Sequence, residues 1–136
     1  MTIKELQSLA KENRSEHEEQ VEVVNYLRKN KILHFAIPNG GQRHKKTARD
    51  LKAEGVVPGV PDLMIAVPNR HYHALFIEMK RRPKTLKSGK KSYSGITVSD
   101  NQKEWLQYLN HNNYKAVVCY GADEAIDVIE EYMEDM

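Results

Sequence analysis

The sequence predicts an α/β domain with a mixed central β-sheet flanked by helices. Segments with helical periodicity alternate along the chain with short apolar runs typical of strands. Two such runs, 62–68 and 74–77, are joined by the turn Asn69-Arg70-His71, which indicates an antiparallel hairpin at the centre of the sheet. The chain has no Gly-x-Gly-x-x-Gly motif and no P-loop, which argues against a doubly wound nucleotide-binding fold.

Length and composition fit one soluble globular domain. The 136 residues are 40% hydrophobic and 29% charged, enough for a single core. We expect residues 15–136 to form that domain and residues 1–14 to form an arm or short helix. No apolar run approaches the roughly 18 residues of a membrane helix, and the N-terminus lacks a signal-peptide core, so a cytosolic protein is expected. Cys119 is the only cysteine, which excludes an intrachain disulfide and favours a packing role.

The first long helix is predicted at residues 15–30, where Ser15 and Glu18 form a capping box. Its apolar stripe is expected to comprise Val21, Val24 and Leu27, with Val23 beside it. Glu16 extends this stripe toward the helix start, so we expect it to face inward, and Glu19 to lie nearer solvent. The alternative is that these glutamates only complement the helix dipole.

The remaining elements follow from similar signals. We predict a strand at 32–37, a helix at 43–54, a helix at 100–112, a strand at 115–120 and a helix at 122–133. Trp105 lies on the apolar stripe of the helix predicted at 100–112, which favours a core role over base stacking. Residues 81–95 are predicted to be a basic loop, functional or mobile at that length.

The net charge of +2 conceals a strong asymmetry along the chain. Residues 43–91 hold thirteen basic and four acidic side chains, a local charge of +9. Residues 100–136 hold two basic and nine acidic side chains, a local charge of −7. Two of the four acids in the basic block are Asp62 and Glu78, so a basic field surrounds two carboxylates. That field suits the approach of a polyanion to a metal site, although charge blocks also occur as solvated surfaces.

The carboxylates lie at the edges of two adjacent predicted strands. Asp62 opens one apolar run, and Glu78-Met79-Lys80 closes the next. Residues at i and i+2 share one face of a strand, so Glu78 and Lys80 would lie side by side. Carboxylates bind Mg²⁺ or Mn²⁺, which activates water, and a nearby lysine suits phosphodiester cleavage. The pattern alone is also compatible with an ordinary ion pair at a strand edge.

Basic side chains on both sides of these strands are candidates for contacts with phosphate. They are Arg43, Lys45, Lys46, Arg49, Arg81, Arg82, Lys84, Lys87, Lys90 and Lys91. Such contacts position DNA without reading its sequence. Tyr93 could stack on a base or bond to a phosphate, and it could equally tether the loop. The six histidines show no zinc-like spacing.

Several motifs together resemble the VRR-NUC nucleases of the PD-(D/E)XK superfamily. The resemblance rests on Gly55-Val-Val-Pro-Gly-Val-Pro-Asp62-Leu, Phe76-Ile-Glu78-Met-Lys80, Ser99-Asp-Asn-Gln102, Glu16-His-Glu-Glu-Gln20 and Ile37-Pro-Asn-Gly-Gly41. It runs from about residue 15 to residue 132 and is closest to small standalone members found in phages and bacteria. It implies a restriction-endonuclease-like core and a location in the cytoplasm of a bacterial or phage-infected cell.

The resemblance also implies roles for single residues. Asp62 and Glu78 would ligate Mg²⁺ or Mn²⁺, with the backbone carbonyl of Met79 as a further ligand. Lys80 would orient or activate the attacking water and stabilise charge at the phosphate.

Residues from two helices would complete this site. Glu16 would reach it from the first long helix and help to hold a second metal. Gln102 would support it from the helix that follows the basic loop. Glu19 is the alternative to Glu16, because the alignment there is the least secure.

The function expected from these features is that of a metal-dependent endodeoxyribonuclease. The resemblance points to branched DNA, including four-way junctions and flaps, and to a homodimer that places two sites on two strands. Three alternatives remain at this point: a nuclease of plain duplex or single-stranded DNA, a non-catalytic DNA-binding module with the same fold, and an RNA-binding protein. The last lacks the aromatic β-platform of RNP motifs.

Overall fold

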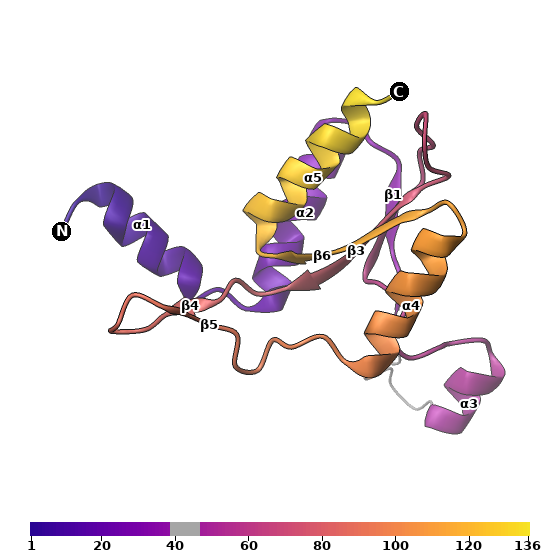
Figure 1. Cartoon of the computed structure of the whole chain (residues 1–136), viewed down its shortest axis with the longest axis horizontal. Helices are drawn as coiled ribbons and strands as arrows, with labels where there is room; N and C mark the ends of the chain where they lie inside the picture. The colour runs from indigo at the N-terminus through magenta and orange to yellow at the C-terminus, as the bar shows by residue number, and fades with distance from the viewer. Residues whose placement is uncertain (39–46) are drawn as a thin grey trace.

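A four-stranded mixed β-sheet forms the centre of the molecule (Figure 1). The computed structural model describes residues 1–38 and 47–136. In spatial order the strands are β1 (His34–Ala36), β2 (Leu63–Ile65), β3 (Leu75–Lys80) and β6 (Lys115–Tyr120). The β2 strand is antiparallel to both β1 and β3, whereas β6 runs parallel to β3. The predicted mixed sheet and its antiparallel central hairpin are therefore confirmed.

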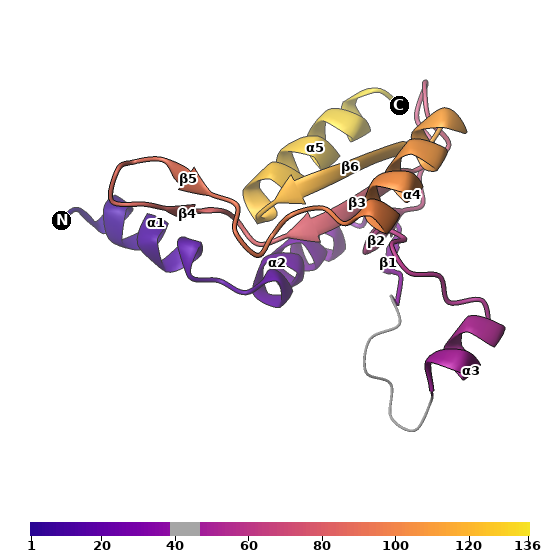
Figure 2. The ribbon, with the colours of Figure 1, turned by 60° about the horizontal axis from the view of Figure 1, so that its bottom comes forward.

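Helices cover both faces of this sheet (Figures 1 and 2). The main core lies between one face and the helices α2 (Glu16–Lys29) and α5 (Ala122–Glu134), where Ile77 and Ile129 are fully buried. The α4 helix (Asp100–His111) packs on the opposite face through Leu106 and Leu109, near Phe76. Because side chains alternate along a strand, Ile77 and Phe76 point into different layers.

The inward face of α2 differs from the predicted one. Glu19, Val23 and Leu27, spaced four residues apart, are fully buried, whereas Val21 is exposed. The prediction that Glu19 lies nearer solvent is therefore wrong. A fully buried carboxylate is rare unless it is paired, so the sequence pattern favoured the apolar Val21 for the inward position.

An arm projects from this body. It consists of α1 (Ile3–Glu12) and a two-stranded hairpin, β4 (Lys84–Thr85) and β5 (Lys91–Ser92), which lie beside each other (Figure 2). The region 81–95, predicted to be a loop, thus contains a short hairpin. Glu12 joins the two parts, because its carboxylate accepts hydrogen bonds from Thr85 and Lys91. No residue of α1 is buried.

A short helix precedes β2. The α3 helix (Ala48–Ala53) is capped by Thr47 and buries Leu51. The helix predicted at 43–54 therefore begins later than predicted, because Thr47 is extended and its side chain caps the helix, whereas residues 43–46 lie outside the described residues. Trp105, predicted to be in the core, is only half-buried on α4. Among the described helices, none is long and apolar enough to cross a membrane.

Candidate active site

Asp62 and Glu78 meet across β2 and β3. The pairing of Leu63 with Ile77, continued by one residue in this antiparallel register, sets Asp62 opposite Glu78. The backbone N–H of Met79 donates a 2.7 Å hydrogen bond to Asp62 Oδ2, which holds this carboxylate against β3. The two acids that the sequence singled out are therefore neighbours in space.

Glu78 is the unusual member of this pair. Glu78 is 2% exposed, and its Oε1 atom is buried without a hydrogen-bond partner among the described residues. Burial, followed by the hydrogen bond and the charge of Asp62, raises the pKa of Glu78 from 4.5 to about 9. Two adjacent carboxylates in a buried site cannot both ionise without a counter-charge, so this site favours a proton or a cation.

Lys80 supplies the ammonium group on the same side of the site. Its Nζ donates a 3.1 Å hydrogen bond to Gln102 Oε1 on α4. The same oxygen accepts the backbone N–H of Ser99 at 2.9 Å and completes the capping box of α4. One side chain thus both begins the helix and orients the lysine, so the helix end is fixed relative to β3.

The turn before Asp62 is packed directly on α4. Gly59 has a φ of +92°, and a Cβ added there would lie 2.6 Å from the backbone carbon of Asn101. Only glycine satisfies both the backbone conformation and this close approach. The turn and the Gln102 helix, two separate motifs in the sequence, therefore form one unit around Asp62. This contact was not predicted from the sequence, although Gly59 between two prolines was a signal for it.

Glu16 and Glu19 occupy different environments, although both lie in the first turn of α2. The pKa of Glu16 is raised by partial burial and then by the charge of Asp62, while Lys80 opposes the shift. Glu16 therefore faces the Asp62 and Lys80 side of the site, although its side chain is exposed. The structure brings Glu16, not Glu19, to the candidate site.

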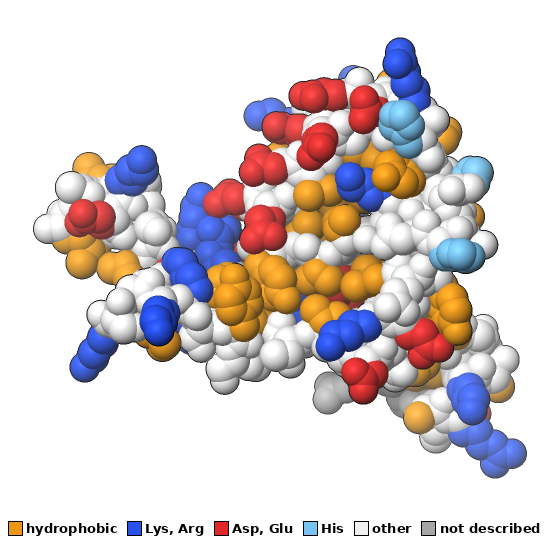
Figure 3. Space-filling view, in the orientation of Figure 1, with side chains coloured by type: hydrophobic (Ala, Val, Ile, Leu, Met, Phe, Trp, Pro, Cys, Tyr) orange, Lys and Arg blue, Asp and Glu red, His pale blue; other side chains and the backbone are white. Residues whose placement is uncertain are grey.

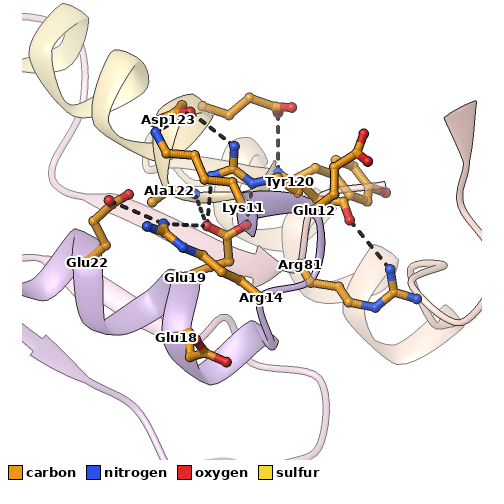
Figure 4. A network of polar contacts seen from close by, with 12 residues as sticks. Lys11, Glu12, Arg14, Glu18, Glu19, Glu22, Arg81, Tyr120, Ala122 and Asp123 are labelled. Carbon is orange, nitrogen blue, oxygen red and sulfur yellow. Dashed lines mark hydrogen bonds and ion pairs between the residues drawn. The ribbon is translucent and has the colours of Figure 1, made fainter. Parts of the chain in front are cut away.

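Glu19, three residues after Glu16 on α2, belongs to a network of ion pairs (Figure 4). Its carboxylate accepts hydrogen bonds from Arg82, Arg14 and the backbone N–H of Ala122. Burial acts to raise the pKa of Glu19, but these donors outweigh it and the pKa is lowered. The sequence analysis missed this network, because nothing in the local pattern joins residues 19 and 82.

An open groove leads to Lys80. It has a volume of about 490 Å³ and lies between the residues before and at the start of α2 and the base of the hairpin. Glu16, Lys80, Arg81 and Lys84 are among its lining residues. Glu16 and Lys80 are therefore accessible from the side on which the arm projects.

The predicted phosphate contacts fall into three groups. Arg43, Lys45 and Lys46 lie outside the described residues. Some basic side chains already have protein partners: Arg82 binds Glu19, Arg81 binds the carbonyls of Arg82 and Ser94, and Lys91 binds Glu12 and Thr85. Arg49, Lys84, Lys87 and Lys90 are exposed, or nearly so, with no ion pair to a described residue.

Two other residues have plain structural surroundings. The ring of Tyr93 packs edge-on against Tyr120 at 5.2 Å, while its side chain stays exposed. Cys119 is buried in the main core, and this burial raises the pKa of its thiol to about 12. Such a thiol remains protonated and unreactive near neutral pH.

The carboxylates do not form a closed cage. Within residues 1–38 and 47–136, no three His, Cys, Asp or Glu side chains converge closely enough to hold a metal ion. Asp62 and Glu78 are adjacent, and Glu16 lies farther out. Mg²⁺ needs only one or two protein carboxylates because it retains several water ligands, so this donor set is sufficient for one such ion.

Comparison with known proteins agrees with this geometry. Residues 3–123 match the model of the VRR-NUC domain family. A solved structure described as a VRR_NUC domain protein is 27% identical, with a TM-score of 0.64 over 90% of this chain and 91% of the other. Curated proteins contain no match to the sequence. The chain therefore belongs to the VRR-NUC family, which implies a nuclease of the PD-(D/E)XK type.

Proposed function

We propose that this protein is an Mg²⁺- or Mn²⁺-dependent endodeoxyribonuclease. The observation that carries the proposal is the Asp62–Glu78 pair, in which a buried carboxylate oxygen of Glu78 lacks a partner beside an oriented lysine. A hard divalent cation would provide the missing partner and the counter-charge. Residues 15–136 would form one nuclease domain that carries the site, and residues 1–14 would belong to the projecting arm.

The chain's own groups divide the chemistry among them. Asp62, Glu78 and the carbonyl of Met79 would hold the ion, and Glu78 would release its proton as the ion binds. When bound, the ion would supply a more acidic water and neutralise charge on the phosphate. Lys80, oriented by Gln102, would stabilise the developing charge at phosphorus. Glu16 would assist from α2 as a further acidic group facing the same water.

DNA would approach along the basic arm. Lys84, Lys87 and Lys90 on the hairpin have no ion-pair partner among the described residues. Lys84 lines the groove that leads to Lys80, and Lys87 and Lys90 lie in the turn between β4 and β5. Lysines of this kind bind phosphates through their charge and give affinity without sequence preference. Arg49 on α3 and Tyr93 would add further contacts to the DNA, as would Arg43, Lys45 and Lys46, which lie outside the described residues.

The finer substrate class follows from the family resemblance: branched DNA, including four-way junctions and flaps. Cleavage of two strands of a junction needs two sites, so we propose a homodimer. The apolar face of α1 supports an association of this kind, because Ile3, Leu6 and Leu9 are exposed. Figure 3 shows such apolar side chains on the projecting helix. Sedimentation or light scattering gives the mass directly, and a monomer at micromolar concentration would contradict the dimer.

Cleavage of labelled DNA tests the activity. Four-way junction, flap, duplex and single-stranded substrates are compared in Mg²⁺, Mn²⁺ and EDTA, for wild type, Asp62→Ala and Lys80→Ala. Asp127→Asn, an exposed acid on α5, is the control. We expect metal-dependent cutting that both site variants abolish while DNA binding persists. Binding without cutting in either metal would instead establish a non-catalytic DNA-binding module, and equal cutting of all substrates would establish a general nuclease.

A further inference from the structure

We propose that the buried ion pair of Glu19 and Arg82 positions the active site. In this inference the pair fixes the start of α2, which carries Glu16, against the end of β3, which carries Lys80. The inference rests on the proposed nuclease function and adds two positioning residues that touch neither DNA nor metal. It assigns a role to a buried charge that the mechanism does not otherwise use.

The pair has a fixed geometry. Arg82 Nε donates to Glu19 Oε2 at 2.6 Å, and Arg82 Nη2 donates to Glu19 Oε1 at 2.8 Å. This two-pronged contact defines both the distance and the angle between the two side chains. Arg14, from the segment before α2, adds a contact of 3.4 Å to Oε1. Glu19 is 0% exposed, so water cannot substitute for any of these donors.

The turn after β6 is shaped around the same pair. Gly121 has a φ of +95°, and a Cβ there would lie 3.1 Å from both Glu19 Oε2 and Arg82 Nε. Its N–H donates a 2.8 Å hydrogen bond to the carbonyl of Lys80, and the next N–H, of Ala122, donates to Glu19 Oε1 at 3.3 Å. Two consecutive amides therefore hold the backbone of the proposed catalytic lysine and the buried carboxylate (Figure 4 labels Glu19 and Ala122).

Stability alone is a weak reason for such a pair. Well-packed hydrophobic residues often replace a buried ion pair at no cost, because desolvation offsets much of the attraction. Apolar contacts, however, lack direction, whereas a two-pronged ion pair fixes an orientation. Glu16 is three residues from Glu19 on α2, and Lys80 is two residues from Arg82 at the end of β3. A change in the geometry of the ion pair would therefore displace both proposed site residues.

The test replaces the charges without leaving one of them unpaired. The double variant Glu19→Leu/Arg82→Leu keeps the buried volume apolar and is expected to fold, with a Tm close to that of wild type. Glu22→Gln, on the same helix and in contact with Arg14, is the matched control. We measure Tm, Mn²⁺ affinity by calorimetry, and kcat and KM on the substrate that wild type cuts. If the site is misplaced in the double variant, its kcat should fall about 100-fold while KM changes little. Glu22→Gln should behave like wild type.

A second measurement separates positioning from general damage. Glu16→Gln is made in wild type and in the double variant. If the ion pair acts by holding Glu16 in place, Glu16→Gln should lower kcat less in the double variant than in wild type. The double variant should also bind Mn²⁺ more weakly than wild type. A folded double variant with wild-type kcat and Mn²⁺ affinity would overturn the inference, as would fully additive losses in kcat. A wild type that neither cuts DNA nor binds Mn²⁺ would instead remove the proposed function, and with it anything for the pair to position.

Discussion

Glu19 and Glu78 are both almost completely buried, at 0% and 2% exposure, yet their surroundings are opposite. Glu19 accepts hydrogen bonds from two arginines and a backbone amide, and its pKa is lowered. Glu78 faces a second carboxylate, keeps one oxygen without a partner, and has a pKa raised to about 9.

The difference teaches that burial alone does not identify a functional carboxylate. Burial raises the pKa of both glutamates, and the partners then decide the outcome. Glu19 is satisfied within the chain, so its charge is part of the folded structure. Glu78 is not satisfied within the described residues, so an external cation has a place to bind. Perturbed carboxylates of the second kind are typical of functional sites.

The largest expected effect is that of Glu78→Gln on activity. Removing the proposed ligand should lower the cleavage rate about 1,000-fold or more, because the ion contributes several kcal/mol of transition-state stabilisation. The same change should raise the Tm of the metal-free protein at pH 8. Wild-type Glu78 keeps its proton when folded but loses it when unfolded, so stability falls as pH rises from about 4.5 toward 9.

Thermal unfolding in EDTA at pH 4 and pH 8 checks this prediction. The advantage of Glu78→Gln should be present at pH 8 and disappear at pH 4, where both states of wild type bind the proton. A variant that is less stable than wild type at pH 8 would contradict the assignment of Glu78 as an unsatisfied, functional group.

Glu19→Gln should have the opposite effect on stability. Removing the buried partner leaves the charged Arg82 with only the exposed carboxylate of Asp123 at 3.1 Å, and breaking a buried pair in this way costs about 3–5 kcal/mol. Urea unfolding at neutral pH gives this value, with Glu22→Gln on the exposed side of Arg14 as the control, expected to lose less than about 1 kcal/mol. Equal losses in the free energy of unfolding for the two variants would mean that Glu19 stabilises the protein no more than Glu22 does.

Metal binding should depend on pH through Glu78. Because the ion replaces a proton on this carboxyl, the Kd for Mn²⁺ should fall about tenfold per pH unit between pH 6 and 8. Calorimetry in buffers with different ionisation enthalpies should report the release of about one proton, in line with the same linkage. A Kd that stays constant over this range would show that Glu78 is already ionised, or is not a ligand.

The smallest expected effect is on the salt dependence of DNA binding. It distinguishes a lysine that has no ion-pair partner among the described residues from one that contacts other side chains. Lys87→Ala should reduce the salt dependence of DNA binding by about 0.9 in slope, the effect of one phosphate contact. Lys91→Ala should change the slope less, because its ammonium contacts Glu12 and Thr85. DNA affinity measured from 50 to 300 mM salt, in Mg²⁺-free buffer, gives the slope for each variant. A larger effect of Lys91 would mean that DNA displaces the Glu12 contact.

Much of the fold was predictable because its signals are local. The capping boxes at Ser15 and Ser99 begin helices within a residue of the predicted positions, and the strand predicted at 115–120 is observed as Lys115–Tyr120. Two short apolar runs, 62–68 and 74–77, and the turn between them indicated the central hairpin. The small hairpin within 81–95 was not predicted, because its strands are two residues each and mostly polar.

The sequence by itself determined the mixed α/β architecture, the family and the proximity of Asp62, Glu78 and Lys80, because strand periodicity and hairpin pairing place neighbours on one face. Only the tertiary structure shows that Glu19 is paired within the chain while Glu16 faces Asp62 and Lys80. That difference depends on Arg82, which is distant from α2 in the sequence and contacts Glu19 only in the folded chain. It also depends on Gly121, whose missing side chain leaves room for the ion pair. Long-range charge pairing leaves no periodic trace in a sequence, so the fold alone determines which buried acid is neutralised within the chain and which remains unpartnered.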